Sequence, residues 1–399
     1  MKILHLNDHF QRMGGAETML FSTLEALDAE GVENAVVHQH PTPLREGRWR
    51  LYQVPHLGEV APPKGALVSE KLEEILRRER PDLVHLYDVG NPRVAQTCLR
   101  FVPTLQSVFN HSFYCPGGAK YLPLFGKVCR RPFGAGCLAA AFLTHCNSIR
   151  PTALFSSYQR SSQMLRKSRG LLFATLSRYQ ADCLLQSGCS PQAIKVLPPF
   201  ADLPDLSKPA SLTGDPVVLF SGRVVPGKGL HLLLRALSGL AISFRLIVDG
   251  AGPTLESAKG LALRLGLKEK VEFVGWAPPQ EHRAYYRQAS VVAVPSLWPE
   301  PFSLVGIEAM SYAKPVVAFA VGGIPEWLED GVTGFLIHPG DLTGMAEKID
   351  FLLQNPSASA AGQLPGDRGD LHRLVRDLLH LLVLQLLDQA PFPDGRGPS

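Results

Sequence analysis

Two carboxylates, Glu300 and Glu308, stand eight residues apart in the most specific pattern of the chain. Glu300 falls in an expected loop, and Glu308 lies about two turns into an expected apolar helix, where burying a carboxylate is costly unless it is hydrogen-bonded. Phe302, Ser303 and Leu304 fall where that helix begins, so their backbone N–H groups are free to face an anion. The segment therefore predicts a site for a ligand with both hydroxyl and anionic groups, and ribose hydroxyls would suit Glu308.

A second cluster places two cations across a glycine-containing loop. Arg223 and Lys228 are five residues apart, between an expected strand and an expected helix. Two such cations can neutralise one diphosphate, as a divalent metal does in other proteins. The spacing from Gly222 to Lys228 and the lack of a following Ser or Thr exclude a P-loop. Solvent-facing loop charges are the alternative, which the position at the end of a strand in an α/β sheet disfavours.

Gly14 and Gly15 form a third cluster, between the first expected strand and the first expected helix. Glycines at this place let backbone N–H groups approach a phosphate at a helix N-terminus. A tight strand-to-helix turn explains them equally well, so both interpretations stay open.

Cysteines gather in an inserted segment of about 111–150 that is rich in Gly and Pro and is expected to be irregular. Four of the seven cysteines lie there: Cys115, Cys129, Cys137 and Cys146. Four thiols can hold a structural zinc ion, but these spacings contain no Cys-x2-Cys pair, and His111 and His145 are competing ligands. A structural zinc site and buried or incidental cysteines therefore remain as two alternatives.

Both halves of the chain alternate short apolar runs with helical runs, which predicts parallel sheets covered by helices on both faces. Strands are expected in the first half at 3–6, 36–37 and 82–87, with helices at 16–29 and 69–78. Strands are expected in the second half at 217–220, 244–248, 271–273, 291–294 and 316–318. The predicted fold class is therefore α/β, with two doubly wound domains.

Composition sets the domain boundaries. A first domain is expected over 1–197, with the cysteine-containing insert at about 111–150, and a second domain over 217–353. Between them, 198–216 is punctuated by prolines and reads as a linker. The tail over 354–399 differs in character, because a Ser-, Ala-, Gly- and Pro-rich run precedes a Leu-rich helix expected at 371–389.

In this order the motifs resemble those of the retaining glycosyltransferases of family 4, which have the GT-B fold of two facing Rossmann-like domains with an interdomain cleft. The resemblance covers about residues 1–353. The matching motifs are Gly14-Gly15-Ala16-Glu17, Gly222-Arg223 with Lys228-Gly229, Asp249-Gly250-Ala251-Gly252, Val271-Glu272-Phe273-Val274-Gly275, the Glu300 and Glu308 pair, Gly322-Gly323-Ile324-Pro325-Glu326 and Gly331-Val332-Thr333-Gly334.

The resemblance implies a role for each donor-binding residue. Arg223 and Lys228 would hold the donor diphosphate and stabilise the leaving nucleotide as charge develops on it. Glu308 would bind the ribose, and Glu300 would lie beside the donor sugar. The N–H groups of Phe302, Ser303 and Leu304 would contact sugar or phosphate, and Gly14 and Gly15 would approach the phosphates from the opposing domain.

His111 falls where the family often has a His-Asp pair near the anomeric carbon, although Ser112 stands here in place of the Asp. The resemblance implies transfer of a hexosyl-type sugar from a nucleotide-diphosphate-sugar to a polysaccharide, glycolipid or similar acceptor with retention of configuration. The departing phosphate would help to take the acceptor proton. The sequence has no Asp-x-Asp motif, which agrees with a metal-independent enzyme that needs no cofactor for catalysis, and domain closure would expel water.

Charge is distributed unevenly along a chain whose net charge is only +4. No Asp or Glu occurs between Asp88 and Asp182, and twelve Lys and Arg residues do. Such a stretch suits an anionic partner, such as a membrane surface or a lipid-phosphate acceptor, or is simply a solvated basic surface. The apolar start is too short for a secretory signal, and no run reaches the about 18 apolar residues of a spanning helix. We therefore expect a cytoplasmic protein with peripheral contact at the inner membrane face.

Two other functions are weighed. The atypical tail motivates a catalytically impaired protein that still binds nucleotide-sugars, and measurable transfer would exclude it. The basic stretch motivates nucleic-acid binding, which would be strongly salt-dependent. The motif order favours the enzyme, and no nucleic-acid partner is expected.

Overall fold

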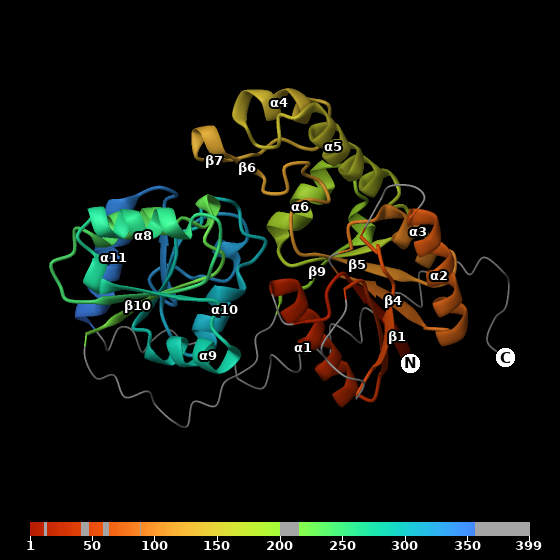
Figure 1. Ribbon diagram of the computed structural model, residues 1–399, viewed down its shortest axis with the longest axis horizontal. Coiled ribbons are helices and arrows are strands. Elements are labelled where there is room, and N and C mark those ends of the chain that lie inside the picture. The colour runs from red at the N-terminus through yellow and green to blue at the C-terminus, as the bar shows by residue number, and fades with distance from the viewer. Residues whose placement is uncertain (12–13, 41–47, 59–63, 88, 200–214, 356–399) are drawn as a thin grey trace.

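The computed structural model describes residues 1–11, 14–40, 48–58, 64–87, 89–199 and 215–355. They form two α/β domains, each with one parallel sheet covered by helices (Figure 1), which confirms the predicted fold class. Most of the expected linker over 198–216, and the expected tail helix at 371–389, lie outside the described residues.

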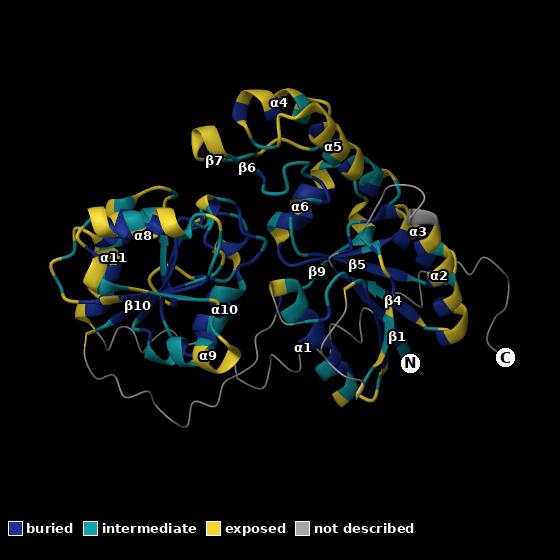
Figure 2. Ribbon diagram, in the orientation of Figure 1, coloured by how far each residue is buried: buried dark blue, intermediate teal, exposed yellow. Residues whose placement is uncertain are grey.

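The N-terminal sheet has seven strands in the order β3-β2-β1-β4-β5-β8-β9, with every neighbouring pair parallel. Its strands are β1 (Lys2–Asn7), β2 (Glu33–His38), β3 (Arg50–Gln53), β4 (Leu83–Leu86), β5 (Thr104–Val108), β8 (Leu172–Thr175) and β9 (Ile194–Val196). Its helices are α1 (Gly15–Ala29), α2 (Lys64–Glu79), α3 (Pro92–Leu99), α5 (Pro151–Arg166) and α6 (Arg178–Gln186). The central strands are largely buried because helices cover both faces of the sheet (Figure 2), and they also carry buried polar side chains such as His5 and Gln106.

The C-terminal sheet has six parallel strands in the order β12-β11-β10-β13-β14-β15. They are β10 (Val217–Ser221), β11 (Arg245–Asp249), β12 (Val271–Gly275), β13 (Val291–Val294), β14 (Val316–Phe319) and β15 (Gly334–Ile337). The helices are α7 (Leu230–Leu237), α8 (Leu255–Arg264), α9 (Pro279–Gln288), α10 (Leu304–Ser311) and α11 (Leu342–Gln354). Both sheets reverse their strand order at one point, between β1 and β4 and between β10 and β13. Parallel sheets bind ligands outside the carboxyl ends of strands at such a point.

The insert is more regular than the sequence predicts. Strands β6 (Tyr121–Leu122) and β7 (Lys127–Val128) form a small antiparallel pair, joined through the short 3-10 helix η1 (Pro123–Phe125). Helix α4 (Gly136–Thr144) follows, because Ala and Leu, which are strong helix formers, fill its centre. The expectation of a wholly irregular segment is therefore wrong for these elements.

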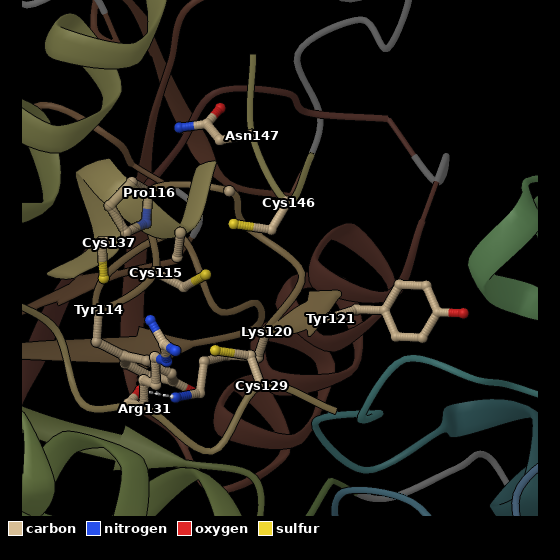
Figure 3. A pocket seen from close by; sticks show the side chains of 12 residues that line it. Tyr114, Cys115, Pro116, Lys120, Tyr121, Cys129, Arg131, Cys137, Cys146 and Asn147 are labelled. Carbon is tan, nitrogen blue, oxygen red and sulfur yellow. Dashed lines mark hydrogen bonds between the residues drawn. The ribbon is translucent and has the colours of Figure 1, made fainter. Parts of the chain in front are cut away.

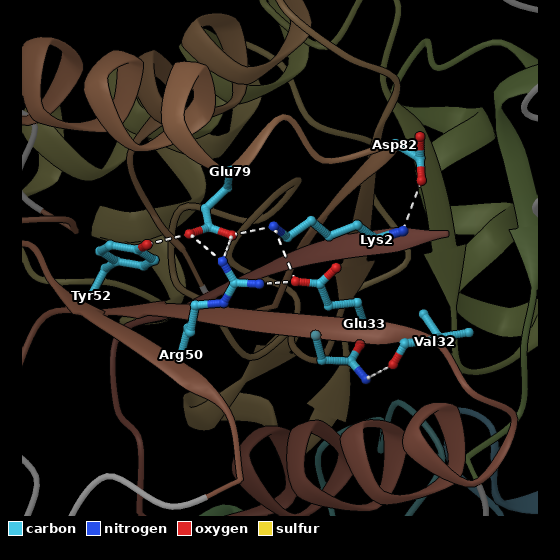
Figure 4. Close-up of polar contacts among 8 residues, drawn as sticks. Lys2, Val32, Glu33, Arg50, Tyr52, Glu79 and Asp82 are labelled. Carbon is cyan, nitrogen blue, oxygen red and sulfur yellow. Dashed lines mark hydrogen bonds and ion pairs between the residues drawn. The ribbon is translucent and has the colours of Figure 1, made fainter.

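A network of charged groups closes the amino ends of the N-terminal strands, away from the carboxyl edge (Figure 4). The buried Glu79 carboxylate at the end of α2 bonds Lys2 Nζ at 2.5 Å, Arg50 Nη1 at 3.3 Å and the Tyr52 hydroxyl. Burial alone would raise the pKa of Glu79, but the Lys2 and Tyr52 hydrogen bonds and the neighbouring cations lower it. This network ties α2 to β1 and β3 and is a structural feature rather than a site.

Candidate active site at the domain interface

Both cations of the predicted diphosphate loop lie against one indole ring. Arg223 Cζ is 5.4 Å and Lys228 Nζ 5.5 Å from the centre of the Trp298 ring, a cation–π geometry that fixes both side chains. Gly227 lies flat on the same indole, since a Cβ there would stand 2.8 Å from Trp298 Cε3. Arg223 is exposed and makes no ion pair within the described residues, so its charge is available to a ligand.

Glu300 is buried, and one of its two carboxylate oxygens accepts three hydrogen bonds. Its Oε1 accepts hydrogen bonds from Lys228 Nζ at 2.8 Å, Ser296 Oγ at 2.5 Å and Trp298 Nε1 at 2.8 Å. Burial would raise the pKa of Glu300, but the Lys228 charge and these donors lower it, so the carboxylate is ionised. As it stands, Glu300 anchors the diphosphate loop, and only its second oxygen is left to face a ligand.

The start of α10 is held in an unusual backbone geometry. Ser303 caps the helix with φ at 78°, a conformation that non-glycine residues rarely adopt outside functional sites. Trp327 Nε1 donates to the Phe302 carbonyl at 2.5 Å, and its ring packs where a Cβ on Gly306 would be 2.0 Å away. The free N–H groups after Phe302 are therefore fixed in place, as an anion site requires.

Glu308, on the same helix, belongs to a polar cluster in which Asp249 and Tyr286 are buried and the side chains of His282 and Glu308 are partly exposed. His282 Nδ1 lies 2.5 Å from Asp249 Oδ2, and its Nε2 lies 3.5 Å from Glu308 Oε2. The Tyr286 hydroxyl donates to the same Glu308 oxygen at 2.9 Å. Burial alone would lower the pKa of His282, but the hydrogen bonds and charges of the two carboxylates raise it to about 9. His282 is thus a cation that orients Glu308.

The N-terminal domain presents a neutral histidine to this site. His111 Nε2 lies 2.6 Å from the carbonyl oxygen of Pro299, the residue before Glu300, and Nδ1 lies 2.6 Å from the Tyr114 hydroxyl. Because a carbonyl can only accept, Nε2 carries the proton and the Tyr114 hydroxyl donates to Nδ1. Burial lowers the pKa of His111 to about 4, so the imidazole is uncharged.

Three further contacts join the two domains. A Cβ on Gly15 would lie 3.0 Å from Leu304 Cδ1, so the glycine turn sits directly against the start of α10. Glu326 accepts hydrogen bonds from the backbone N–H groups of Arg178 and Tyr179, both at 2.8 Å, and so caps α6 from the other domain. An apolar cluster fills the space between them, with Leu176 from one domain packed against Phe302 and other residues of the second.

The structure thus brings the predicted donor residues to one interface. The C-terminal domain supplies Arg223, Lys228, Glu300, Phe302, Ser303, Leu304 and Glu308, and the N-terminal domain supplies Gly14, Gly15 and His111. Sequence reasoning missed three residues that hold them, Trp298, His282 and Tyr286, and it gave no role to Glu326, which it names only within a motif. Their sequence signals are visible in retrospect, since Trp298 lies two residues before Glu300 and His282 and Tyr286 are four apart on one helix face.

Comparison with known proteins follows the same division. Residues 205–363 match the family described as Glycosyl transferases group 1, and residues 13–204 match Glycosyltransferase Family 4. D-inositol 3-phosphate glycosyltransferase of Corynebacterium aurimucosum is 34% identical over 215 residues, which are 48% of this chain and 51% of that protein. The match thus spans about half the length of this relative.

Two solved structures share the fold over nearly the whole chain. A glycosyltransferase of Rickettsia africae superposes with a TM-score of 0.72 at 17% identity, covering 98% of this chain and 99% of that chain. Anabaena Alr3699/HepE in complex with UDP has a TM-score of 0.65 at 21% identity, covering 98% of each chain.

Proposed function

The chain belongs to the group 1 glycosyl transferases of family 4 and has their GT-B fold, and on that premise we propose that it moves a hexosyl group from a nucleotide-diphosphate-sugar to a carbohydrate or lipid-linked acceptor. One observation carries the proposal. The C-terminal domain presents a cation, Arg223, without an ion pair among the described residues, and the bonded Glu300 carboxylate, while the start of α10 lies against a glycine turn of the other domain. That set suits a sugar nucleotide, which carries a diphosphate, a ribose and a sugar.

UDP is the nucleotide to test first, because the crystal structure of the similarly folded Anabaena protein is a complex with UDP. In this proposal Arg223 neutralises the departing diphosphate as charge develops on it. Lys228 has three donors and can add a phosphate contact while it keeps its bond to Glu300. The two cations would thereby replace a catalytic metal.

The state of His111 bears on stereochemistry. Its proton is committed to the Pro299 carbonyl and its other nitrogen to Tyr114, so it does not offer a free basic atom to the acceptor. This supports a reaction in which the leaving phosphate takes the acceptor proton on the same face of the sugar, with retention of configuration. His111 then positions the loop that carries Glu300.

The transfer assay uses the full chain with UDP-, GDP- and ADP-hexoses, and reads nucleotide release with and without EDTA. We expect nucleotide release with one nucleotide class, and the same rate in the presence of EDTA. The NMR signal of the anomeric proton should show that the product has the same anomeric configuration as the donor. Loss of activity in EDTA would contradict the metal-free mechanism, and inversion would contradict retention. A chain that binds nucleotide but never transfers would favour the impaired alternative.

The acceptor side of the molecule suits an anionic membrane. The insert and α5 expose six large apolar side chains, each more than half exposed: Leu124, Phe125, Phe142, Leu143, Ile149 and Phe155. Helix α4 contacts both η1 and α5, so these exposed residues belong to adjoining elements; Figure 2 colours much of α4 and α5 as exposed. They stand within the stretch that lacks acidic residues, and exposed apolar groups among basic ones bind anionic bilayers.

No helix among the described residues is long and apolar enough to cross a bilayer. We therefore propose peripheral contact through this surface, tested by flotation with vesicles of phosphatidylcholine with or without phosphatidylglycerol. We expect flotation only with the anionic vesicles, reduced severalfold by Leu143→Ser. Leu263→Ser, at an equally exposed site on α8, is the matched control. Equal flotation of both variants would contradict the assignment of the surface.

A further inference from the structure

Four cysteines that are scattered along the insert line one small cavity (Figure 3). They come from separate places in the chain: Cys115 before β6, Cys129 after β7, Cys137 in the first turn of α4 and Cys146 after that helix. The cavity between them has a volume of about 20 Å³, which suits one ion or one water molecule. The fold has therefore gathered these four thiols, although their spacing spans 31 residues (146 minus 115).

The insert has no hydrophobic core of its own to explain this arrangement. Among the described residues, no buried apolar cluster is centred in it. Phe113 and Tyr114 at its start belong to the N-terminal domain core, and Cys115 and Val128 pack at the edges of the two large domain cores. Its secondary structure is two strands of two residues, one 3-10 turn and the nine-residue α4. Modules of this size usually need a disulfide or a metal ion to hold them together.

A buried cation beside the thiols favours the metal. Lys120 is 4% exposed, and its Nζ donates to the Arg131 carbonyl at 2.6 Å without an ion pair in the described part of the chain. No carboxylate occurs between Asp88 and Asp182 to neutralise it. A zinc ion with four thiolates carries a formal charge of about −2, which would supply the missing counter-charge.

Burial perturbs two of the four thiols. Burial raises the pKa of Cys115 and of Cys137, against the opposing pull of Lys120. No set of three or more His, Cys, Asp or Glu side chains in the described ranges already has metal-binding geometry. Binding would therefore need the thiols to lose protons and to turn inward about their χ1 bonds.

We propose that Cys115, Cys129, Cys137 and Cys146 bind one structural zinc ion that holds the insert together, with Lys120 as its counter-charge. When zinc binds, the four thiols release four protons, and no oxidant is needed. Two disulfides are the competing way to use four cysteines, and they would leave Lys120 without an anion.

The test begins with the unaltered full-length protein, purified without metal-binding tags. Mass spectrometry of the metals should find about one zinc ion per chain, and thiol titration after denaturation in a chelator should find all seven thiols. Less than about 0.1 zinc per chain after refolding with zinc in excess, or fewer than seven thiols, would overturn the proposal. Neither measurement depends on glycosyl transfer, so the zinc proposal can fail while the proposed function stands.

Variants then locate the ion. Cys129→Ser and Cys146→Ser should each lower bound zinc at least fivefold, and Cys189→Ser, a cysteine outside the insert, should keep it. If a ligand variant fails to fold, the unaltered protein is instead loaded with cobalt in place of zinc. We then expect the intense thiolate-to-cobalt absorption of a site with four sulfur ligands. Absence of that absorption, or zinc loss in Cys189→Ser alone, would refute this ligand set.

Discussion

The two faces of the domain interface are built in opposite ways. On the C-terminal face nearly every polar side chain is bonded to another: Glu300 to Lys228, and Glu308 to His282 and Tyr286. The N-terminal face offers a glycine turn and a neutral His111, and the stretch between Asp88 and Asp182 in this domain contains no carboxylate side chain. A preorganised polar site costs little reorganisation when a charged ligand arrives.

This difference in polar contacts suggests separate roles for the two domains. We infer that the C-terminal face recognises the donor through groups that are already aligned. We propose that the N-terminal face closes over the donor with backbone and apolar contacts, and that its basic stretch serves to bind the acceptor. Variants on the first face should therefore change donor binding, and variants on the second should change closure.

The largest effect is expected from breaking the buried pair on the donor face. Glu300→Ala leaves Lys228 without its carboxylate in a buried site, which costs about 3–5 kcal/mol. We expect at least a hundredfold loss of transfer and a clear fall in the midpoint of thermal unfolding. Glu300→Gln, which keeps the shape, separates charge from packing. Normal activity and stability in both variants would contradict the claim that the C-terminal face is a preorganised donor site.

Arg223→Ala comes second and should separate binding from stability. Its guanidinium is exposed and unpaired within the described residues, so its loss should leave the unfolding midpoint unchanged. Removing a charge that stabilises the departing diphosphate should lower kcat/KM about a hundredfold. Arg264→Ala, at an exposed site on α8, is the matched control and should behave as wild type. A fall in stability without a fall in activity would contradict the assigned role.

His282→Asn should weaken nucleotide binding about tenfold, toward the lower end of the range for a hydrogen bond to a charged group. The pH dependence sharpens this test. Because folding raises the pKa of His282 from 6.5 to about 9, its stabilisation is complete below pH 6.5 and is lost as the pH rises through 9. Calorimetry from pH 6 to 10 should show that loss in wild type only. If the variant lost stability between pH 6 and 10 in the same way as wild type, His282 would not be the charged group responsible.

Glu326→Ala should give the smallest effect, because it removes only the cap that the C-terminal domain places on α6. Loss of such a cap costs about 1 kcal/mol. We expect a severalfold higher KM for the donor, an unchanged kcat, and a larger radius of gyration in solution scattering. Glu329→Ala, on an exposed carboxylate nearby in the chain, controls for the change in charge. Unchanged scattering would argue that Glu326 does not hold the domains together.

Much of the fold is predictable because long apolar runs mark strands that are buried on both faces. β13 (Val291–Val294) was predicted to the residue, and β10 and β14 to within one residue. β3, β5, β8, β9 and β15 were missed. β3 is a half-exposed edge strand with two polar ends, β15 opens with a glycine, β5 carries Thr, Gln and Ser among its five residues, and β8 and β9 are only four and three residues long. In these strands, sheet pairing rather than local composition decides the structure.

The site is less visible in the sequence than the fold. Motif spacing identifies Arg223, Glu300 and Glu308, but not the bond between Glu300 and Lys228, which joins residues 72 positions apart. His282 and Trp298 were missed for the same reason, since each acts through a partner that only the fold brings close. The roles assigned to individual donor residues remain predictions that the experiments above address.

The most direct test of the donor site measures nucleotide binding. Calorimetric titrations of UDP, GDP and ADP compare wild type with Glu308→Ala, with thermal unfolding recorded for both proteins. We predict that one nucleotide binds wild type and that the variant, still folded, loses at least tenfold in affinity. Failure of all three nucleotides to bind the folded wild type, or equal affinity in the variant, would contradict a donor site on the C-terminal face.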